Sequence, residues 1–362
     1  MRSTSIGVLL LLSPLCGRSL VAQHPERAEG PVEGASFRVY DGEGRSSSFA
    51  ELLDALEEAE VVLVGEQHDD AMGHQVEAEL LIRAAQRLGV LGDDPESRPV
   101  VLSLEMFERD VQYIVDEYLS DLITEEQFTR SSRPWPAYDT DYRPMVRFAR
   151  AHGIPVVAAN APRRYVNLVS RQGPTALSDL SDAAKAFLPP LPYPEASEEY
   201  AAQWNALMSE MMASQAAATD SASSSDPAAD VDTTRAAMAL EGEAAAAGTE
   251  QEEPAEEGGQ PPPRGHGMGN ALHAQALWDA AMGHSVVDAL IRHQGGLVIH
   301  YAGSFHVQRG TGIQERVLGY RPGTRLLTVV LQPADDIDAW DSEEHRGLAH
   351  FVVLTRSPAT SH

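Results

Sequence analysis

The stretch VVLVGEQHDD, residues 61–70, decides the fold and locates the chemistry. Residues 61–64 are apolar without alternation, and three of the four are β-branched, which is typical of a strand buried on both faces of a parallel sheet. Gly65 then lets the chain turn off the sheet, and Glu66 and His68 follow at once. The stretch therefore predicts a buried strand that presents a carboxylate and an imidazole at its carboxyl end.

Segments of the same kind alternate with helical segments along the chain. Strands are expected at 61–64, 100–104, 154–160, 296–303, 325–331 and 349–355, and 37–44 is expected to be an edge strand or hairpin. Helical patterns, several of them closed by glycine, cover 72–88, 108–119, 141–153, 162–173 and 271–296. This alternation predicts an α/β fold, a largely parallel sheet with helices on both faces.

An acidic segment interrupts the expected domain. Residues 209–263 hold 12 acidic residues, one basic residue and no aromatic residue. Such a composition cannot bury enough apolar surface to offset its ordering entropy. We expect a disordered acidic insertion over 209–265, with a partial helix near 241–248 as the alternative. An expanded surface loop is favoured over an arm that binds a partner or increases solubility.

The N-terminus has the pattern of a secretory signal. Arg2 precedes a short apolar run, residues 6–12, which is too short to span a bilayer, and small residues follow. We expect cleavage after Ala22. The remaining expected boundaries are a flexible N-terminal segment at 23–35, the α/β domain at 36–335, and a C-terminal strand and tail at 336–362.

Cysteine content and charge narrow the class of protein. Cys16 is the only cysteine, and the preceding Pro14 and Leu15 disfavour a lipoprotein signal. We expect an exported protein, periplasmic or associated with the envelope, whose mature chain has no catalytic thiol. The formal net charge of −27 argues against nucleic acid and against a basic membrane patch.

Polar side chains follow four of the expected strands, at the edge where parallel sheets bind ligands. Glu66 and His68 follow the first strand, Glu105 the second, Asn160 the third, and His306 a late one. Each alone could cap a helix or sit satisfied in a loop. However, a carboxylate directly after VVLSL lies near the core, where burial is costly without a partner. The coincidence across separate strands predicts one site.

Two imidazoles and two carboxylates allow two kinds of chemistry. Glu66, His68 and His306 suit a divalent metal ion of the zinc, manganese or iron type. The same residues, together with Glu105, equally suit metal-free proton transfer between carboxylate and imidazole. His74, six residues after His68, is expected to support the site from the next helix. The residue types leave the two kinds of chemistry open.

An aromatic loop, RPWPAYDTDYRP at residues 133–144, lies between expected elements. One interpretation is a lid that packs on the domain. The other is a stacking surface for a flat ligand, with Tyr138 or Tyr142 as a tyrosinate ligand to iron. These two tyrosines are the candidate cofactor-binding residues.

Five segments together resemble the ChaN family of haem-binding proteins associated with iron uptake. They are VLVGEQHDDAMGHQVEAELL, LSLEMFERDVQ, WPAYDTDYRPMVRFARAHGIPVVAANAPRR, AQALWDAAMGHSV and AGSFHVQRGTGIQERV, in this order between about residues 37 and 332. The family is similar to the TIKI metalloprotease-like proteins and the erythromycin esterases. The resemblance therefore implies an erythromycin-esterase- and ChaN-like fold.

The resemblance also implies site residues and partners. In the superfamily, Glu and His at the ends of the first strands and a His on a late strand form the active centre. Glu66, His68, Glu105 and His306 match those positions, although erythromycin esterases place the first His one residue further from the Glu. ChaN-like proteins imply haem as the ligand, a homodimer that shares haem, and association with the envelope.

Three hypotheses follow. The first is an exported haem- or iron-binding protein. The second is a metal-dependent hydrolase in which Glu66 or Glu105 is the general base for a water polarised by His68 and His306. The third is an interaction protein whose acidic insertion carries the function.

Overall fold

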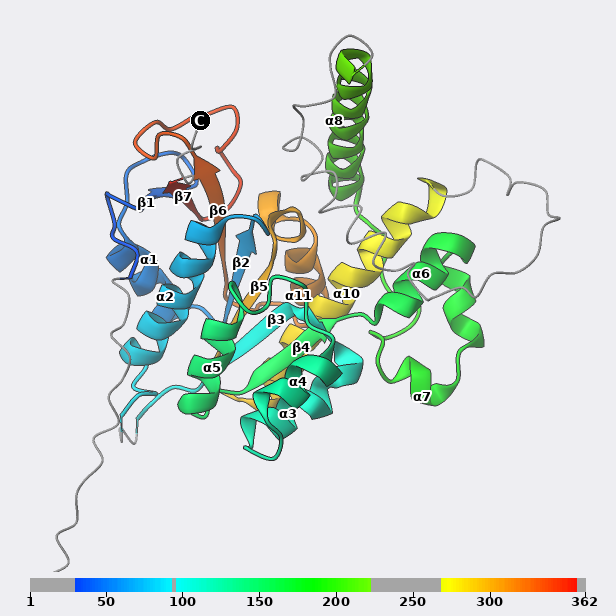
Figure 1. The fold of residues 1–362 in the computed structure, drawn as a ribbon, viewed down its shortest axis with the longest axis horizontal. Helices are drawn as coiled ribbons and strands as arrows, with labels where there is room; N and C mark the ends of the chain where they lie inside the picture. The colour runs from blue at the N-terminus through cyan, green and yellow to red at the C-terminus, as the bar shows by residue number, and fades with distance from the viewer. Residues whose placement is uncertain (1–29, 93–95, 223–267, 357–362) are drawn as a thin grey trace, which may run out of the picture. The chain divides into compact units, whose positions relative to one another are not determined.

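A seven-stranded sheet organises the part of the chain described by the computed structural model, residues 30–92, 96–222 and 268–356. The strand order is β1-β7-β6-β2-β5-β3-β4, and every neighbouring pair except β1 and β7 is parallel. The strands, shown in Figure 1, are β1 Phe37–Asp41, β2 Val61–Glu66, β3 Val100–Glu108, β4 Val156–Asn160, β5 Leu297–Gly303, β6 Leu326–Ala334 and β7 Phe351–Arg356. The predicted largely parallel α/β sheet is confirmed.

Helices cover both faces of the sheet. One face carries α1 Phe49–Glu58, α2 Ala71–Arg87, α3 Gln112–Leu119, α4 Glu125–Ser132 and α5 Arg143–Ala151. The other carries α6 Arg163–Gln172, α10 Met268–Arg292 and α11 Ile313–Tyr320. Shorter or peripheral helices are α7 Asp182–Lys185, α8 Glu198–Ala222 and the 3-10 helices η1 Arg109–Val111, η2 Pro174–Asp179, η3 Ser304–His306 and η4 Gln308–Gly310. No sequence-based prediction covers α1, α4 or α11.

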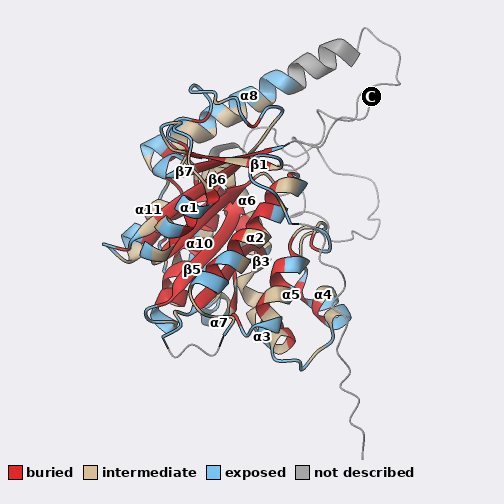
Figure 2. Cartoon of the chain, turned by 90° about the vertical axis from the view of Figure 1, so that its left-hand side faces the viewer, coloured by how far each residue is buried: buried red, intermediate tan, exposed pale blue. Residues whose placement is uncertain are grey.

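The apolar strands serve two cores because successive side chains point to opposite faces. Val62 and Val64 of β2 pack on the α2 face, whereas Val61 and Leu63 pack on the α10 face. Figure 2 shows the buried residues running along the central strands and the inner sides of these helices. Burial of β2 on both faces explains why residues 61–64 are all apolar.

The register of the central strands sets the site. β2 pairs with β5 from Val61 opposite Val298 to Glu66 opposite Gly303, so Glu66 reaches the sheet edge beside the start of η3. β3 lies on the other side of β5. The carboxyl ends of these three strands therefore meet at one edge.

Two predictions about the strands need correction or refinement. The strand predicted at 100–104 continues to Glu108, so Glu105 lies within β3 rather than beyond its end. Its continued pairing with β4, through an irregular register after Leu104, explains the extra length. The segment predicted as an edge strand or hairpin is the edge strand β1, which pairs antiparallel with β7.

The predicted disordered insertion is wrong at its beginning. Helix α8 runs to Ala222, so residues 209–222 are helical rather than disordered. The Ala-rich sequence at the start of the segment has high helix propensity, and α8 continues from a packed first turn. The rest of the predicted insertion, 223–265, lies outside the described residues, as do the predicted signal peptide and the tail beyond Arg356. Among the described residues, no helix combines the length and the hydropathy needed to span a membrane.

Gly65 should tolerate no larger side chain. A Cβ at this position would lie 2.9 Å from the Ser304 Cα and 3.1 Å from the Val307 Cβ. We expect Gly65→Ala to lower the free energy of unfolding by about 1–3 kcal/mol through overpacking, measured by urea unfolding. The matched control is Gly319→Ala in α11, where a Cβ would meet nothing within 4 Å. Equal stability of the Gly65→Ala variant and the parent chain would contradict the packing.

The imidazole of His300 in β5 should make folding sensitive to acid. It is fully buried, with Nδ1 2.8 Å from the Ser103 hydroxyl. Burial, assisted by the charge of His306, lowers the pKa of His300 to about 3. The unfolded chain therefore binds a proton below about pH 6.5 that the folded chain does not, and stability falls as the pH drops.

We expect this single group to remove about 2 kcal/mol of the free energy of unfolding between pH 7 and pH 5. In His300→Asn, whose amide oxygen can still accept from Ser103, that part of the pH dependence should disappear. Urea unfolding of both proteins at several pH values measures the difference. Identical pH slopes for the two proteins would show that His300 does not carry the effect.

Candidate functional site

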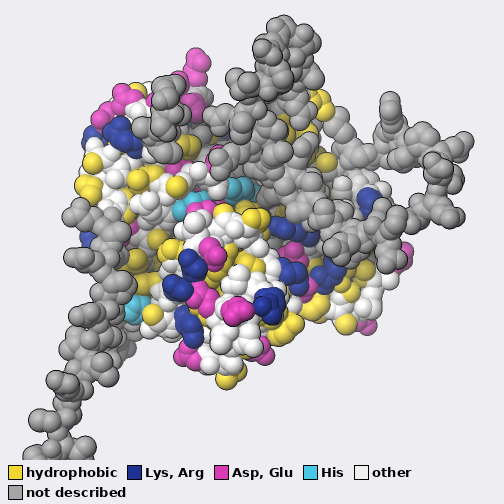
Figure 3. All heavy atoms as spheres, in the orientation of Figure 1, with side chains coloured by type: hydrophobic (Ala, Val, Ile, Leu, Met, Phe, Trp, Pro, Cys, Tyr) yellow, Lys and Arg dark blue, Asp and Glu magenta, His cyan; other side chains and the backbone are white. Residues whose placement is uncertain are grey.

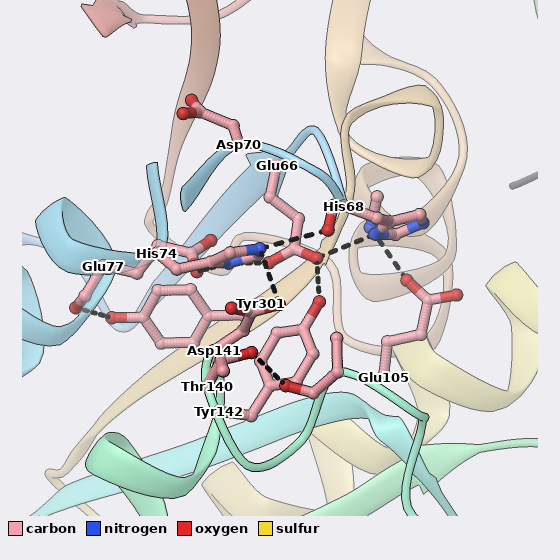
Figure 4. A network of polar contacts seen from close by, with 12 residues as sticks. Glu66, His68, Asp70, His74, Glu77, Glu105, Thr140, Asp141, Tyr142 and Tyr301 are labelled. Carbon is pink, nitrogen blue, oxygen red and sulfur yellow. Dashed lines mark hydrogen bonds and ion pairs between the residues drawn. The ribbon is translucent and has the colours of Figure 1, made fainter. Parts of the chain in front are cut away.

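Glu66, the last residue of β2, is the centre of a polar network at the sheet edge (Figure 4). It is 2% exposed, yet three side chains from other segments reach its carboxylate. The Tyr142 hydroxyl donates to Oε1 at 2.6 Å, His68 Nδ1 lies 2.7 Å from Oε1, and His74 Nδ1 lies 3.4 Å from Oε2. Burial would raise the pKa of Glu66, but the bonds from His68 and His74 hold it below its ordinary value. Glu66 is therefore an ionised carboxylate in the protein interior.

His68 is the accessible member of the network. Its side chain is 24% exposed, whereas that of Glu66 is 1% exposed. Its ring packs edge-on against Trp135 at 4.8 Å between centroids. On the other side, a Cβ added to Gly303 would lie only 3.0 Å from the His68 Cε1. Gly303 thus leaves the space that the His68 ring occupies.

Helix α2 supplies the inner part of the network. Asp70 caps it by accepting from the Met72 N–H at 3.1 Å and also accepts from the Thr355 hydroxyl, which fixes the start of the helix. One turn later, His74 Nδ1 lies 3.1 Å from Glu77 Oε2, as the spacing of three residues on a helix allows. Its Nε2 lies 3.2 Å from the His68 carbonyl oxygen. The helix therefore brings an imidazole and a second carboxylate to Glu66.

Charge in this inner cluster, Glu66, His74 and Glu77, is balanced. Burial would lower the pKa of His74, but its bonds to Glu66 and Glu77 raise it to about 12. Burial and the charge of Glu66 raise the pKa of Glu77 well above its ordinary value. One carboxylate, one imidazolium and one neutral carboxyl group leave no net charge in the buried cluster.

A second cluster, Glu105, Asp279 and His306, lies on the other side of His68. His306 Nδ1 is 2.7 Å from Asp279 Oδ1, and His306 Nε2 is 3.8 Å from Glu105 Oε1. Glu105 Oε2 also accepts from the Gly303 N–H at 2.8 Å. All three side chains are at most 3% exposed. The imidazole is thus oriented by one carboxylate and faces another, an arrangement in which an imidazole can act as a general acid or base.

The structure brings the four predicted catalytic residues to one edge of the sheet. Figure 4 shows Glu105 pointing toward His68, and Figure 3 shows histidine side chains gathered near the middle of this face. Asn160, which also ends a strand, instead accepts from the Ala161 N–H at 2.8 Å. The predicted metal set, Glu66, His68 and His306, spans both clusters, and its role as a ligand set stays a prediction.

The two candidate haem tyrosines have different surroundings. Tyr142 belongs to the site, but its hydroxyl donates to Glu66, and burial raises its pKa so that it stays protonated. Tyr138 packs against Phe107 and Phe128, and burial raises its pKa too. Both side chains are 1% exposed. The role of either tyrosine in binding haem stays a prediction.

Sequence reasoning missed two carboxylates of the site. Glu77 carries a signal that was available, because it stands three residues after His74 in a helical pattern. Asp279 was recognisable only as a polar residue on one face of a long helix, together with Gln275. Nothing in the sequence pairs Asp279 with His306, since 27 residues separate them and β5 lies between.

Comparisons with known proteins give a family and a fold. The family model described as haem-binding uptake, Tiki superfamily, ChaN matches residues 52–317. A solved structure described as cofacial haem binding to ChaN of Campylobacter jejuni superposes with a TM-score of 0.57 at 15% identity, over 90% of this chain and 100% of that chain. This likeness shows the shared fold.

Two further solved structures are more distant. The type III effector HopBA1 has a TM-score of 0.40 at 10% identity, over 85% of this chain and 92% of that chain. The erythromycin esterase EreC in an open conformation has a TM-score of 0.38 at 11% identity, over 89% and 83%. No curated protein sequence matches the chain. Because the family model spans most of the chain, including the strands and helices that build both clusters, this protein belongs to the ChaN family of the Tiki superfamily.

Proposed function

We propose that this protein binds haem and serves iron uptake after export from the cytoplasm. The observation that carries the proposal is the match of the ChaN haem-binding family model over residues 52–317. The fold neighbour from Campylobacter jejuni is described as binding haem cofacially, which is in line with the same ligand. Export and envelope association rest on the signal-like sequence of residues 1–22.

We place the haem at the exposed side of the site, beside His68. Imidazole is a common axial ligand of haem iron, and His68 is the site's partly exposed imidazole. Its Nδ1 is held by Glu66 at 2.7 Å, which orients the ring as carboxylates do for metal-binding histidines. Trp135, half-buried beside it, offers a flat apolar surface to a porphyrin. We therefore favour His68 over the buried Tyr138 and Tyr142 as the iron ligand.

Arginine beside this edge suits the haem propionates. The Arg163 guanidinium lies 5.9 Å from the centroid of the Trp135 ring. The same Trp135 ring also contacts His68. The Arg163 side chain is 27% exposed, and its ion pair with Glu108 is long, at 3.8 Å. A porphyrin against Trp135 would bring a propionate within reach of this cation, which can bind a carboxylate through two hydrogen bonds.

Titration of the purified chain with haemin, followed by visible absorption, tests this proposal. We expect a saturable Soret shift at one haem per chain or per dimer. His68→Ala should weaken haem binding by about tenfold or more because the axial ligand is lost. The matched control is His152→Ala, an exposed histidine at the end of α5.

The outcomes separate two claims. Absence of a saturable shift in the parent chain would overturn haem binding. If the parent and His68→Ala bind haem equally and Tyr142→Phe does not, haem binding stands, and Tyr142 of the aromatic loop is the residue that binds the iron.

A second candidate function is hydrolysis, favoured by the arrangement of His306 between Asp279 and Glu105. In this hypothesis His306 accepts a proton from water, and Asp279 stabilises the resulting imidazolium. We expect any hydrolysis of p-nitrophenyl esters to fall by about 10²–10⁴-fold in His306→Ala and to fall in Asp279→Asn, without a change in haemin titration. Ester hydrolysis that survives both substitutions would exclude this centre as its source.

A further inference from the structure

The inner cluster places three hydrogen-bond acceptors around one point. Without a metal ion, the proton on His74 balances the charge of this cluster. When that proton leaves Nδ1 and Nε2 keeps its N–H toward the His68 carbonyl oxygen at 3.2 Å, the neutral ring presents the lone pair of Nδ1 to the cluster. That nitrogen lies 3.1 Å from Glu77 Oε2 and 3.4 Å from Glu66 Oε2. Three converging acceptors repel one another unless something positive lies between them, either a proton or a metal ion.

The surrounding hydrogen bonds leave these acceptors to the cluster. Tyr142 donates to the other oxygen of Glu66, Oε1, and the Tyr301 hydroxyl donates to the backbone carbonyl of Glu77 rather than to its side chain. Within the described part of the chain, Glu66 Oε2 and Glu77 Oε1 have no hydrogen-bond donor, although both carboxylates are at most 2% exposed. Buried carboxylate oxygens of this kind usually have a partner, and a proton or a metal ion shared with His74 Nδ1, 3.4 Å from Glu66 Oε2, would supply one.

Distances and charge fit a small divalent cation. Each of the three residues offers a donor atom within 4.8 Å of the other two. Donor atoms at the corners of a tetrahedral site with bonds of about 2.1 Å lie about 3.4 Å apart, close to the two distances from His74 Nδ1. Two ionised carboxylates, a neutral imidazole and a divalent cation also sum to zero charge, as a buried site requires.

We propose that Glu66, His74 and Glu77 form a buried binding site for a divalent transition-metal ion. His74 Nδ1 and one oxygen of each carboxylate are the ligands, a nitrogen and oxygen set that suits manganese, iron or zinc. Asp141 lies 3.6 Å from His74 Nε2 and its side chain is 16% exposed, so negative charge extends from the cluster toward the surface. The site lies beneath His68 and does not require haem. It also differs from the set Glu66, His68 and His306, because it draws its other two ligands from α2.

Cobalt(II) is the probe that tests the site. The full chain is stripped with a chelator and titrated with Co²⁺, with the visible absorption spectrum and the bound metal measured on the same samples. We expect one Co²⁺ per chain in the parent protein, and an affinity reduced by about 100-fold in His74→Ala and in Glu77→Gln. His306→Ala and the exposed control His152→Ala should bind as the parent does.

The isosteric Glu77→Gln keeps the test decisive even where His74→Ala fails to fold, and circular dichroism checks each variant. Co²⁺ should also raise the midpoint of thermal unfolding of the parent chain but not of Glu77→Gln. Failure of the parent chain to bind Co²⁺ stoichiometrically would overturn the proposal. So would full binding by Glu77→Gln, or loss of binding in His306→Ala with retention in His74→Ala, which would place the metal in the second cluster.

Discussion

A single buried charge, the carboxylate of Glu66, constrains the whole sheet edge. It ends the central strand β2 and is 2% exposed, so water cannot stabilise it. An unpaired carboxylate in such a place costs several kcal/mol. Its partners come from three separate segments: the turn after β2, helix α2, and the loop before α5. Each segment must close over the strand end for the charge to be tolerated, and together they wall the site. The aromatic loop is therefore held both by packing and by the hydrogen bond from Tyr142 to Glu66.

The site divides into two clusters with His68 between them. The inner one is built by helical spacing, since His74 and Glu77 share one face of α2. The second cluster is built by the sheet and α10. Glu105 lies in β3, His306 lies in η3 directly after the neighbouring strand β5, and Asp279 comes from α10, which packs over them. Gly303 joins the two: its N–H donates to Glu105, and its missing side chain leaves room for the His68 ring. The inner cluster is suited to holding a cation, whereas His306 in the second cluster is suited to moving a proton. The partly exposed His68 lies between them.

Membership of a haem-binding family and a carboxylate–imidazole constellation are compatible for a physical reason. In the proposed haem site, His68 is the iron ligand, Trp135 the aromatic surface and Arg163 the cation, and Trp135 lies next to both of the others. The buried clusters beneath need none of these features. The same fold can therefore bind a ligand at its surface while the two carboxylate–imidazole clusters stay buried in a fixed geometry.

The sequence by itself determined the sheet and the meeting of Glu66, His68, Glu105 and His306 at the carboxyl end of its strands. Uninterrupted apolar runs leave few structures other than strands buried on both faces, and polar residues at the ends of parallel strands must share one edge. It did not determine where β3 stops, because Glu105 looks like the residue after the strand until β4 is seen to pair as far as Glu108. Nor did it determine that Asp279 contacts His306 or that the Tyr142 hydroxyl donates a hydrogen bond to Glu66. Those contacts join residues 27 and 76 positions apart, and only the packing of α10 and of the aromatic loop on the sheet brings them within hydrogen-bond distance.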